Sequence, residues 1–174
     1  MGCRVNELLR VNLRWMAGHD LRNLCEIGRQ SGEHPWGETH FQEFLSRTET
    51  AVMVAEYDSR TIGFIAYEAL DSGIFVRNLV VVPAFRRRGV ASQMFARLCY
   101  RLNDKMQKFI RLDVRESNVS AQLFFKALGF RATHILKDFF EDTGEDAYRM
   151  QYRHKQIPIC GKAEPGTQRS AVKG

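Results

Sequence analysis

The sequence is poor in the features that cross-link or anchor a chain. Its four cysteines, Cys3, Cys25, Cys99 and Cys160, are widely separated and form no C-x-x-C pair, which argues against a disulfide framework or a cysteine-based metal site. No apolar run approaches the ~18 residues that span a membrane. The opening MGCRVN has Asn6 where a myristoylation signal requires Ser or Thr. We therefore expect a soluble cytoplasmic protein with reduced thiols, with no bound metal and no membrane partner.

What the chain does contain suits a globular domain. Of its 174 residues, 44% are hydrophobic and 26% charged, as in ordinary soluble proteins. We expect a single domain over residues 1–154. Residues 155–174 are rich in Pro, Gly and Lys and show no periodicity, which predicts a flexible C-terminal tail.

The basic charge is concentrated rather than spread. The net charge is +6, with much of the excess in three adjacent arginines at 86–88 and in the tail, while residues 138–146 are acidic. Such an excess suits an anionic partner, which could be RNA, a membrane surface or a phosphorylated cofactor. Composition alone leaves these three open.

Hydrophobic periodicity predicts strands and helices in a definite order. Residues 74–82 are rich in β-branched residues on both faces, as in an interior strand, and Pro83 ends the strand. The whole order predicts a mixed sheet with helices on both faces. We expect strands at 11–16, 51–57, 61–70, 74–82, 108–114, 130–140 and 146–153, and helices at 21–30, 38–47, 89–102 and 118–128.

The stretch VVPAFRRRGVA, residues 81–91, links the interior strand to a helix. A tight loop at a helix start presents unpaired backbone N–H groups and the positive end of the helix dipole, which together bind phosphate. Gly89 allows the backbone to approach closely. The loop contains neither G-x-x-x-x-G-K-[ST] nor G-x-G-x-x-G; its pattern is R-x-x-G-x-A, at Arg86, Gly89 and Ala91.

That pattern resembles the pyrophosphate loop of the GNAT acetyltransferase superfamily. Other segments follow in the family's order, namely HPW, NLVVVPAFRRRGVA, LDVRESN, FFKALGF and DFFEDTGEDAYRM. Within the superfamily, residues 10–153 most resemble the RimI-type ribosomal-protein-alanine N-acetyltransferases. The resemblance implies a GNAT fold with a mixed, mostly antiparallel sheet of about seven strands and helices on both faces. It also implies acetyl-CoA-dependent acetylation of a protein N-terminus, with a ribosomal protein as one candidate acceptor.

The resemblance also assigns a cofactor site. It implies main-chain bonds from residues 79–81 to the pantetheine arm, a pyrophosphate cradle at 87–92, and a cofactor contact from Asn118. The alternative is that the arginines form a solvated cluster and that Asn118 only caps a helix. The residues assigned to acetyl-CoA are Leu79, Val80, Val81, Arg86, Arg87, Arg88, Gly89, Val90, Ala91, Ser92 and Asn118.

The chemistry needs a neutral amine and a route for its proton. The family's general base is a glutamate in L-E-V-R-x-S-N, and Asp113 stands at that position, one methylene shorter. An α-amine with a pKa of ~8 is already ~10% neutral at pH 7, so a modest base could serve it. The alternative is that Asp113 only pairs with Arg111 or Arg115 on the strand surface.

The family's general acid is missing from its expected position. Aligning Asn118 with the family asparagine places Phe125 where the family has a tyrosine. Phe125 belongs to an apolar helical stripe with Ala121, Phe124 and Leu128, which favours a core role. Tyr148 and Tyr67 are the remaining tyrosines to inspect, although both suit structural roles. His34 and His40 flank the HPW turn without metal-ligand spacing and are interpreted as ordinary loop residues.

The acidic stretch falls in the predicted turn between the last two strands. It could attract a basic protein N-terminus, or it could be a solvated turn. Two other functions remain open: acetylation of a small-molecule amine on the same fold, and a non-catalytic acyl-CoA-binding or RNA-binding domain. Under the leading hypothesis the partners are acetyl-CoA and a peptide N-terminus, nucleic acid enters only through a ribosomal substrate, and the chain is a monomer or a homodimer. The acidic residues are Asp138, Glu141, Asp142, Glu145 and Asp146.

Overall fold

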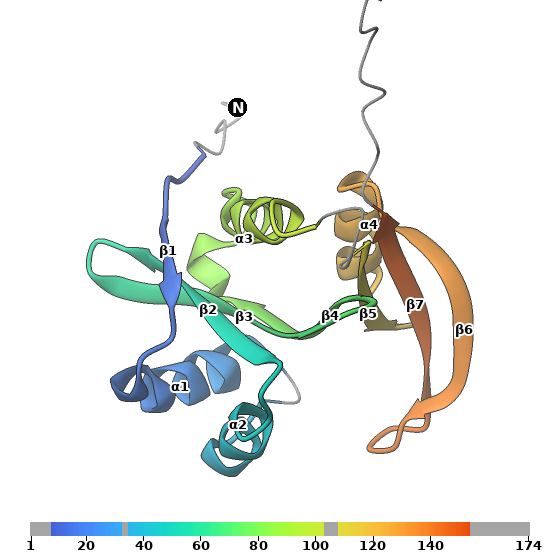
Figure 1. Ribbon diagram of the computed structural model, residues 1–174, viewed down its shortest axis with the longest axis horizontal. Helices are drawn as coiled ribbons and strands as arrows, with labels where there is room; N and C mark the ends of the chain where they lie inside the picture. The colour runs from blue at the N-terminus through green and yellow to red at the C-terminus, as the bar shows by residue number, and fades with distance from the viewer. Residues whose placement is uncertain (1–7, 33–34, 103–107, 154–174) are drawn as a thin grey trace, which may run out of the picture.

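A seven-stranded sheet runs through the molecule in the order β1-β2-β3-β4-β5-β7-β6 (Figure 1). The computed structural model describes residues 8–32, 35–102 and 108–153, so the predicted tail at 155–174 lies outside the described residues. Every neighbouring pair is antiparallel except β4 and β5, which are parallel. The strands are β1 (Asn12–Trp15), β2 (Thr50–Tyr57), β3 (Arg60–Leu70), β4 (Gly73–Val81), β5 (Phe109–Arg115), β6 (Arg131–Phe140) and β7 (Glu145–Arg153).

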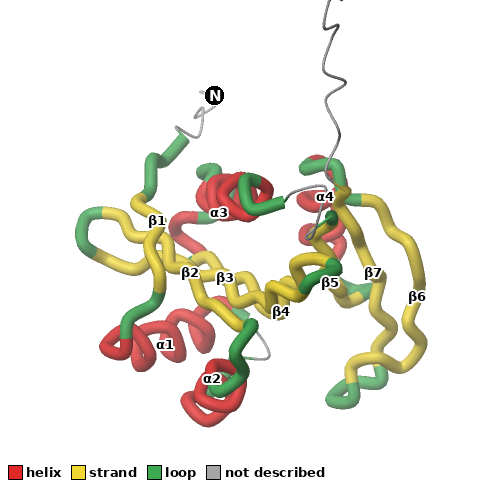
Figure 2. Tube along the Cα trace, in the orientation of Figure 1, coloured by secondary structure: helices red, strands yellow, loops and turns green. Residues whose placement is uncertain are grey.

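Helices cover both faces of the sheet (Figures 1 and 2). On one face lie α1 (Leu21–Ser31) and α2 (Glu38–Leu45), and on the other α3 (Val90–Cys99) and α4 (Val119–Ala127). Two short 3₁₀ turns, η1 (Gly18–Asp20) and η2 (Pro83–Phe85), complete the order. The predicted fold class and element order are therefore confirmed. The third predicted helix is shorter than expected, because it ends at Cys99, although Leu102 beyond it is still buried.

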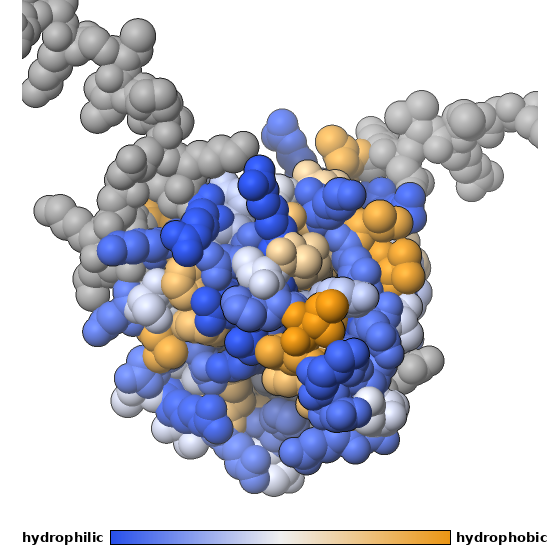
Figure 3. Space-filling model, turned by 90° about the vertical axis from the view of Figure 1, so that its right-hand side faces the viewer, coloured by the Kyte–Doolittle hydropathy of each residue, from blue (hydrophilic) through white to orange (hydrophobic). Residues whose placement is uncertain are grey.

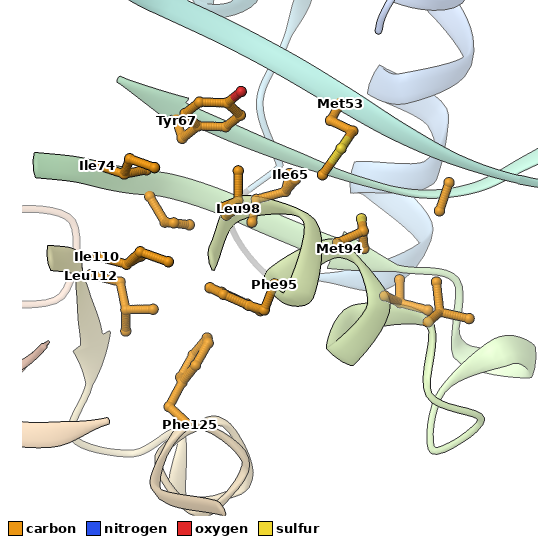
Figure 4. Packing of buried hydrophobic residues seen from close by; sticks show 14 of the residues in the cluster. Met53, Ile65, Tyr67, Ile74, Met94, Phe95, Leu98, Ile110, Leu112 and Phe125 are labelled. Carbon is orange, nitrogen blue, oxygen red and sulfur yellow. The ribbon is translucent and has the colours of Figure 1, made fainter. Parts of the chain in front are cut away.

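Each face of the sheet has its own apolar core. Phe41 of α2 packs with Leu24 of α1 and Phe64 of β3 in the smaller core. The larger core joins α3 and α4 to the opposite face through Phe95 and Phe125, which Figure 4 shows facing the strands. Because β4 supplies residues to both cores, it is apolar on both faces, as its composition predicts.

The sheet opens between its two parallel strands. Within the described residues, β4 and β5 are paired only at Ile74↔Ile110 and Phe75↔Arg111. Beyond this point β4 continues beside β3 as far as Val81, with a register shift opposite Ala66 and Tyr67. One edge of β4 is therefore left for another partner between Val76 and Val81.

Figure 3 shows the face of the molecule on the β6 side. This surface is mostly hydrophilic, with small apolar groups between the polar ones. Ile135 and Phe139 are the large apolar side chains that β6 exposes. None of the helices in the described ranges is long and apolar enough to cross a membrane.

Candidate functional site

A cleft of about 430 Å³ lies where β4 leaves β5. Its walls are the free end of β4, the arginine loop with the start of α3, the start of α4, and the end of α1. Ten of the eleven residues assigned to the cofactor line it, all except Arg88. The described lining residues are Gly28, Ser31, Gly32, Pro35, Asn78, Leu79, Val80, Val81, Phe85, Arg86, Arg87, Gly89, Val90, Ala91, Ser92, Asn118, Ser120, Ala121 and Phe124.

The backbone of the arginine loop is shaped for an anion. Arg87 and Gly89 both have left-handed conformations, with φ of +61° and +78°. Gly89 is the N-cap of α3 and offers no capping side chain, and the first helical bond runs from Gln93 N to Gly89 O. The N–H groups before Gln93, in the first turn of α3, therefore have no intrahelical partners. They lie at the end of the helix that borders the cleft. This arrangement fits a pyrophosphate, which the helix dipole also favours.

The three loop arginines have different surroundings. Arg86 donates from Nε to the Val81 carbonyl at 2.9 Å and from Nη2 to the Ser31 carbonyl at 2.6 Å, so its guanidinium ties the end of α1 to the loop. Arg88 lies outside the cleft lining, with its guanidinium 6.0 Å from the centre of the Phe85 ring. Arg87 remains on the cleft wall.

The end of α1 contributes a wall that the sequence did not indicate. Gly28, Ser31, Gly32 and Pro35 line the cleft opposite the loop. A Cβ on Gly28 would lie 3.4 Å from the Pro35 Cβ, so glycine lets the segment after α1 fold back closely. The only signal in the sequence was Gly28 on the apolar face of a predicted helix, which is also explained by packing.

Asn118 has the capping role that was one of its two interpretations. Its Oδ1 accepts a hydrogen bond from the Ala121 N–H at 3.0 Å, at the first turn of α4. The residue also lines the cleft. Capping leaves the side-chain amide N–H groups available, so the predicted cofactor contact stays a prediction.

Asp113 pairs with an arginine that the sequence analysis did not consider. Its two carboxylate oxygens accept from Arg149 Nε at 2.8 Å and Nη2 at 3.0 Å, across the register pair of β5 and β7. This ion pair raises the pKa of Arg149. The predicted alternative named the wrong partners for Asp113. Arg111 contacts Gln151 instead, and Arg115 contacts the β6–β7 turn. Asp113 is also absent from the described cleft lining, and its role as general base stays a prediction.

A sequence profile of the acetyltransferase (GNAT) family matches residues 18–130, which is more than half of the chain. The chain belongs to this family. A Bacillus subtilis protein named as a candidate ribosomal protein bS18-alanine N-acetyltransferase is 27% identical over 142 residues, covering 81% of this chain and 94% of the relative. The resemblance to that enzyme class noted in the sequence is thereby confirmed.

Solved structures agree on the fold. The ribosomal-protein-S18-alanine N-acetyltransferase of Escherichia coli superposes with a TM-score of 0.74 at 20% identity, covering 90% of this chain and all of that one. Arabidopsis thaliana NAA60, solved in complex with acetyl-CoA, superposes with a TM-score of 0.73 at 21% identity, covering 83% and 98%. This chain is therefore a GNAT-fold acetyltransferase.

The tyrosines of the acetyltransferase do not supply an acid at the cleft. Phe125, in the family's tyrosine position, is 5% exposed and packs against Phe95 and Phe130, which confirms its core role. Tyr67 is fully buried, accepts a hydrogen bond from Arg101 at 3.3 Å, and has a pKa raised by its burial. Tyr148 pairs with Val114 and Ile135 in the sheet and is outside the described lining.

Of the two histidines that flank the HPW turn, His34 lies outside the described residues. His40 stacks on Trp36 with ring centres 4.3 Å apart. This contact fits the interpretation of His40 as an ordinary structural residue.

The acidic turn is largely paired within the protein. Arg115 binds Asp142 at 2.7 Å and Glu145 at 3.3 Å, and its guanidinium lies 3.9 Å from the centre of the Phe140 ring. Asp146 pairs with Lys137 at 2.5 Å, which lowers the pKa of Asp146. Hydrogen bonds from Ser117, with Arg115, lower the pKa of Glu145. Most of this charge therefore holds the turn against the start of α4, which weakens the hypothesis that the turn attracts a basic peptide.

Proposed function

We propose that this acetyltransferase moves the acetyl group of acetyl-CoA directly to the α-amine of a protein N-terminus. The observation that carries the proposal is the chemistry of the cleft wall. None of its described lining residues is acidic, and none is histidine, tyrosine, cysteine or lysine; the charged ones are Arg86 and Arg87. A wall of this kind suits a phosphorylated cofactor, but its described residues include no base that could activate its serines for a covalent intermediate or take a proton from the amine.

An acceptor in such a site must supply its own neutral amine. An α-amine with a pKa of ~8 is ~10% neutral at pH 7, whereas a lysine side chain at ~10.4 is less than ~0.1% neutral. The difference of more than a hundredfold favours the α-amine. Asp113, beside the point where β4 and β5 part, would accept the proton directly or through one water, held in place by Arg149.

The protein groups that would bind acetyl-CoA follow from the geometry. Backbone N–H groups at the start of α3, with Arg87, would hold the pyrophosphate, and the free edge of β4 from Leu79 to Val81 would pair with the pantetheine as an added strand. Bound there, acetyl-CoA supplies a thioester. Transfer forms a C–N bond and breaks the C–S bond, while the amine gives up one proton and the thiolate takes one up.

Water is the proposed source of the proton for the thiolate. A thiol with a pKa of ~8.5 can leave partly as the thiolate, so a positioned acid accelerates the step without being required. The buried position of Phe125 and the absence of Tyr148 from the described cleft lining support this assignment. We also propose that the protein is cytoplasmic and is a monomer or a homodimer.

Acceptor profiling tests the proposal. The protein with acetyl-CoA would be offered N-terminally free peptides, the same peptides with blocked α-amines and one internal lysine, and spermine. Thiol release and the mass of the product would be measured. We expect acetylation at the α-amine only, with a ribosomal S18 N-terminus as the first sequence to try because the named relatives act on it. Transfer to spermine alone would indicate a small-molecule enzyme, and acetyl-CoA binding without any transfer would indicate a non-catalytic domain.

A further inference from the structure

Arginine and aromatic side chains form a compact patch at the point where β4 and β5 part. We call Phe75, Arg77, Phe109 and Arg111 the arginine–aromatic patch. The two phenylalanine rings meet edge to face with centres 5.6 Å apart. The Arg111 guanidinium lies 4.7 Å from the centre of the Phe109 ring and 5.4 Å from that of Phe75, and Arg77 lies 5.8 Å from Phe75. Gly73 makes room for this packing, because a Cβ there would lie 2.6 Å from the Phe109 ring.

The patch faces the side of the sheet from which an acceptor must come. Along β5, Ile110, Leu112 and Val114 point into the core under α3 and α4, so Arg111 and Asp113 point to the opposite face. The core side is closed by Leu112, Phe95 and Phe125, all 5% exposed or less (Figure 4). Among the described residues, the face that carries the patch and Asp113 is therefore the open approach for an amine to the parting of β4 and β5.

Positive charge exceeds negative charge in and around the patch. Glu68 is shared between Arg47 at 3.1 Å and Arg77 at 2.5 Å, and Asp113 is held by Arg149. Arg111 forms no ion pair with a described carboxylate; its Nη2 donates to Gln151 at 3.1 Å, and its buried Nε has no hydrogen-bond partner among the described residues. Around the patch, Arg47, Arg77, Arg111 and Arg149 therefore stand against Glu68 and Asp113, and Arg111 is the one whose charge no described carboxylate neutralises.

A guanidinium packed against two aromatic rings has lost part of its hydration, which strengthens its attraction to an anion. Arginine also matches the planar, two-oxygen geometry of a carboxylate. We infer that the acceptor N-terminus carries an aspartate or glutamate within its first three residues, and that Arg111 is the residue that recognises it. This inference rests on the proposed function and reverses the expectation of a basic acceptor.

The test compares three peptides that differ only at the second residue, Asp, Asn or Lys, with a fluorophore at the C-terminus. Two quantities would be measured: kcat/KM for α-amine acetylation, and peptide binding to the CoA complex by fluorescence polarisation. For the unaltered protein we expect kcat/KM at least tenfold higher for Asp than for Asn, and lowest for Lys, with the same order in binding.

Arg111→Met should bring the Asp-to-Asn ratio close to one in both measurements. Arg97→Met on α3 is the matched control, because Arg97 is exposed on the other face of the sheet, and it should keep the ratio. Arg77→Met, at a more exposed position, should reduce the ratio and serves if Arg111→Met does not fold. Equal or Lys-favouring values in the unaltered protein would overturn the inference while leaving the proposed function intact. Failure to acetylate all three peptides and the S18 peptide would overturn the proposed function itself.

Discussion

The two ends of the proposed site, the loop in the cleft and the strand surface beside it, would bind their ligands by different means. At the loop end, around Gly89, the groups that face the cleft are mainly backbone N–H donors in a fixed left-handed turn. At the strand end, where β4 and β5 part, the groups are side chains from three strands, among them Phe75, Arg111 and Arg149. A backbone site needs the right conformation and accepts many side chains, whereas a side-chain site depends on each residue. The loop end therefore suits a constant cofactor, and the strand end determines the acceptor.

The largest expected effect is at the loop end. Gly89→Asp forces a side chain into a φ of +78°, places its Cβ 2.9 Å from Leu8 Cδ2, and adds negative charge beside the phosphate donors. We expect loss of the rise in melting temperature that acetyl-CoA gives the unaltered protein. At a ligand concentration of about 100 Kd that rise corresponds to about 2.7 kcal/mol.

Gly144→Asp is the matched control for this variant. Gly144 also has a positive φ, +66°, but lies in the β6–β7 turn, where a Cβ would have open space. It imposes a similar backbone cost far from the loop, so the melting shift with acetyl-CoA should survive. An equal shift in Gly89→Asp and the unaltered protein would show that the pyrophosphate binds elsewhere.

The next largest effect is expected on catalysis, from substitutions of Asp113 and Arg149 at the strand end. If Asp113 is the base, Asp113→Asn should lower kcat by up to ~10², most strongly at mildly acidic pH, where the amine is mostly protonated, while the cofactor KM is retained. Arg149→Gln keeps the carboxylate and removes its cation, so this variant should stay active.

A purely structural ion pair gives another pattern. Both variants would then unfold at lower temperature and lose similar fractions of activity at every pH between 6 and 9. Melting curves and pH–rate profiles on the same preparations separate the two cases.

The difference between the two ends also explains what the sequence could predict. The loop is local: R-x-x-G-x-A after an apolar strand specifies a left-handed turn at a helix start, and Arg86, Gly89 and Ala91 do line the cleft. The strands and helices are likewise encoded in hydrophobic periodicity, because each residue's face depends only on its near neighbours.

The strand end is not local. Asp113 and Arg149 are 36 positions apart and meet only because β5 and β7 pair in one register. Likewise, Arg115 reaches the acidic turn only once β6 and β7 are in place. Sequence reasoning considered the neighbours of Asp113 along its own strand, and the true partner lay on the adjacent strand. The cleft wall at the end of α1 could not be predicted for the same reason, because it meets the arginine loop only in the folded chain.

A smaller effect concerns the missing acid. Phe125→Tyr would place a hydroxyl in the core, where the described structure gives Phe125 only apolar and aromatic neighbours. We expect a loss of roughly 1–3 kcal/mol in unfolding free energy and no gain in kcat. Phe124→Tyr is the control, since Phe124 lines the cleft and is only half-buried, so its hydroxyl can reach water and should cost less. A faster Phe125→Tyr enzyme would show that position 125 reaches the leaving thiolate after all.

The smallest effect is expected in the acidic turn, where Glu141→Lys tests whether long-range charge contributes to acceptor choice. Glu141 is exposed and has no ion pair among the described residues, so its charge acts through solvent and is screened over ~10 Å at 0.1 M salt. Reversing it should raise kcat/KM for the Asp peptide by less than about twofold at low ionic strength, and the gain should vanish in high salt. Asp142→Lys differs, because it breaks the contact with Arg115 that holds the turn, and should reduce turnover of Asp and Asn peptides alike. A tenfold, salt-sensitive loss for a basic peptide in Glu141→Lys would instead return acceptor recognition to the acidic turn and away from Arg111.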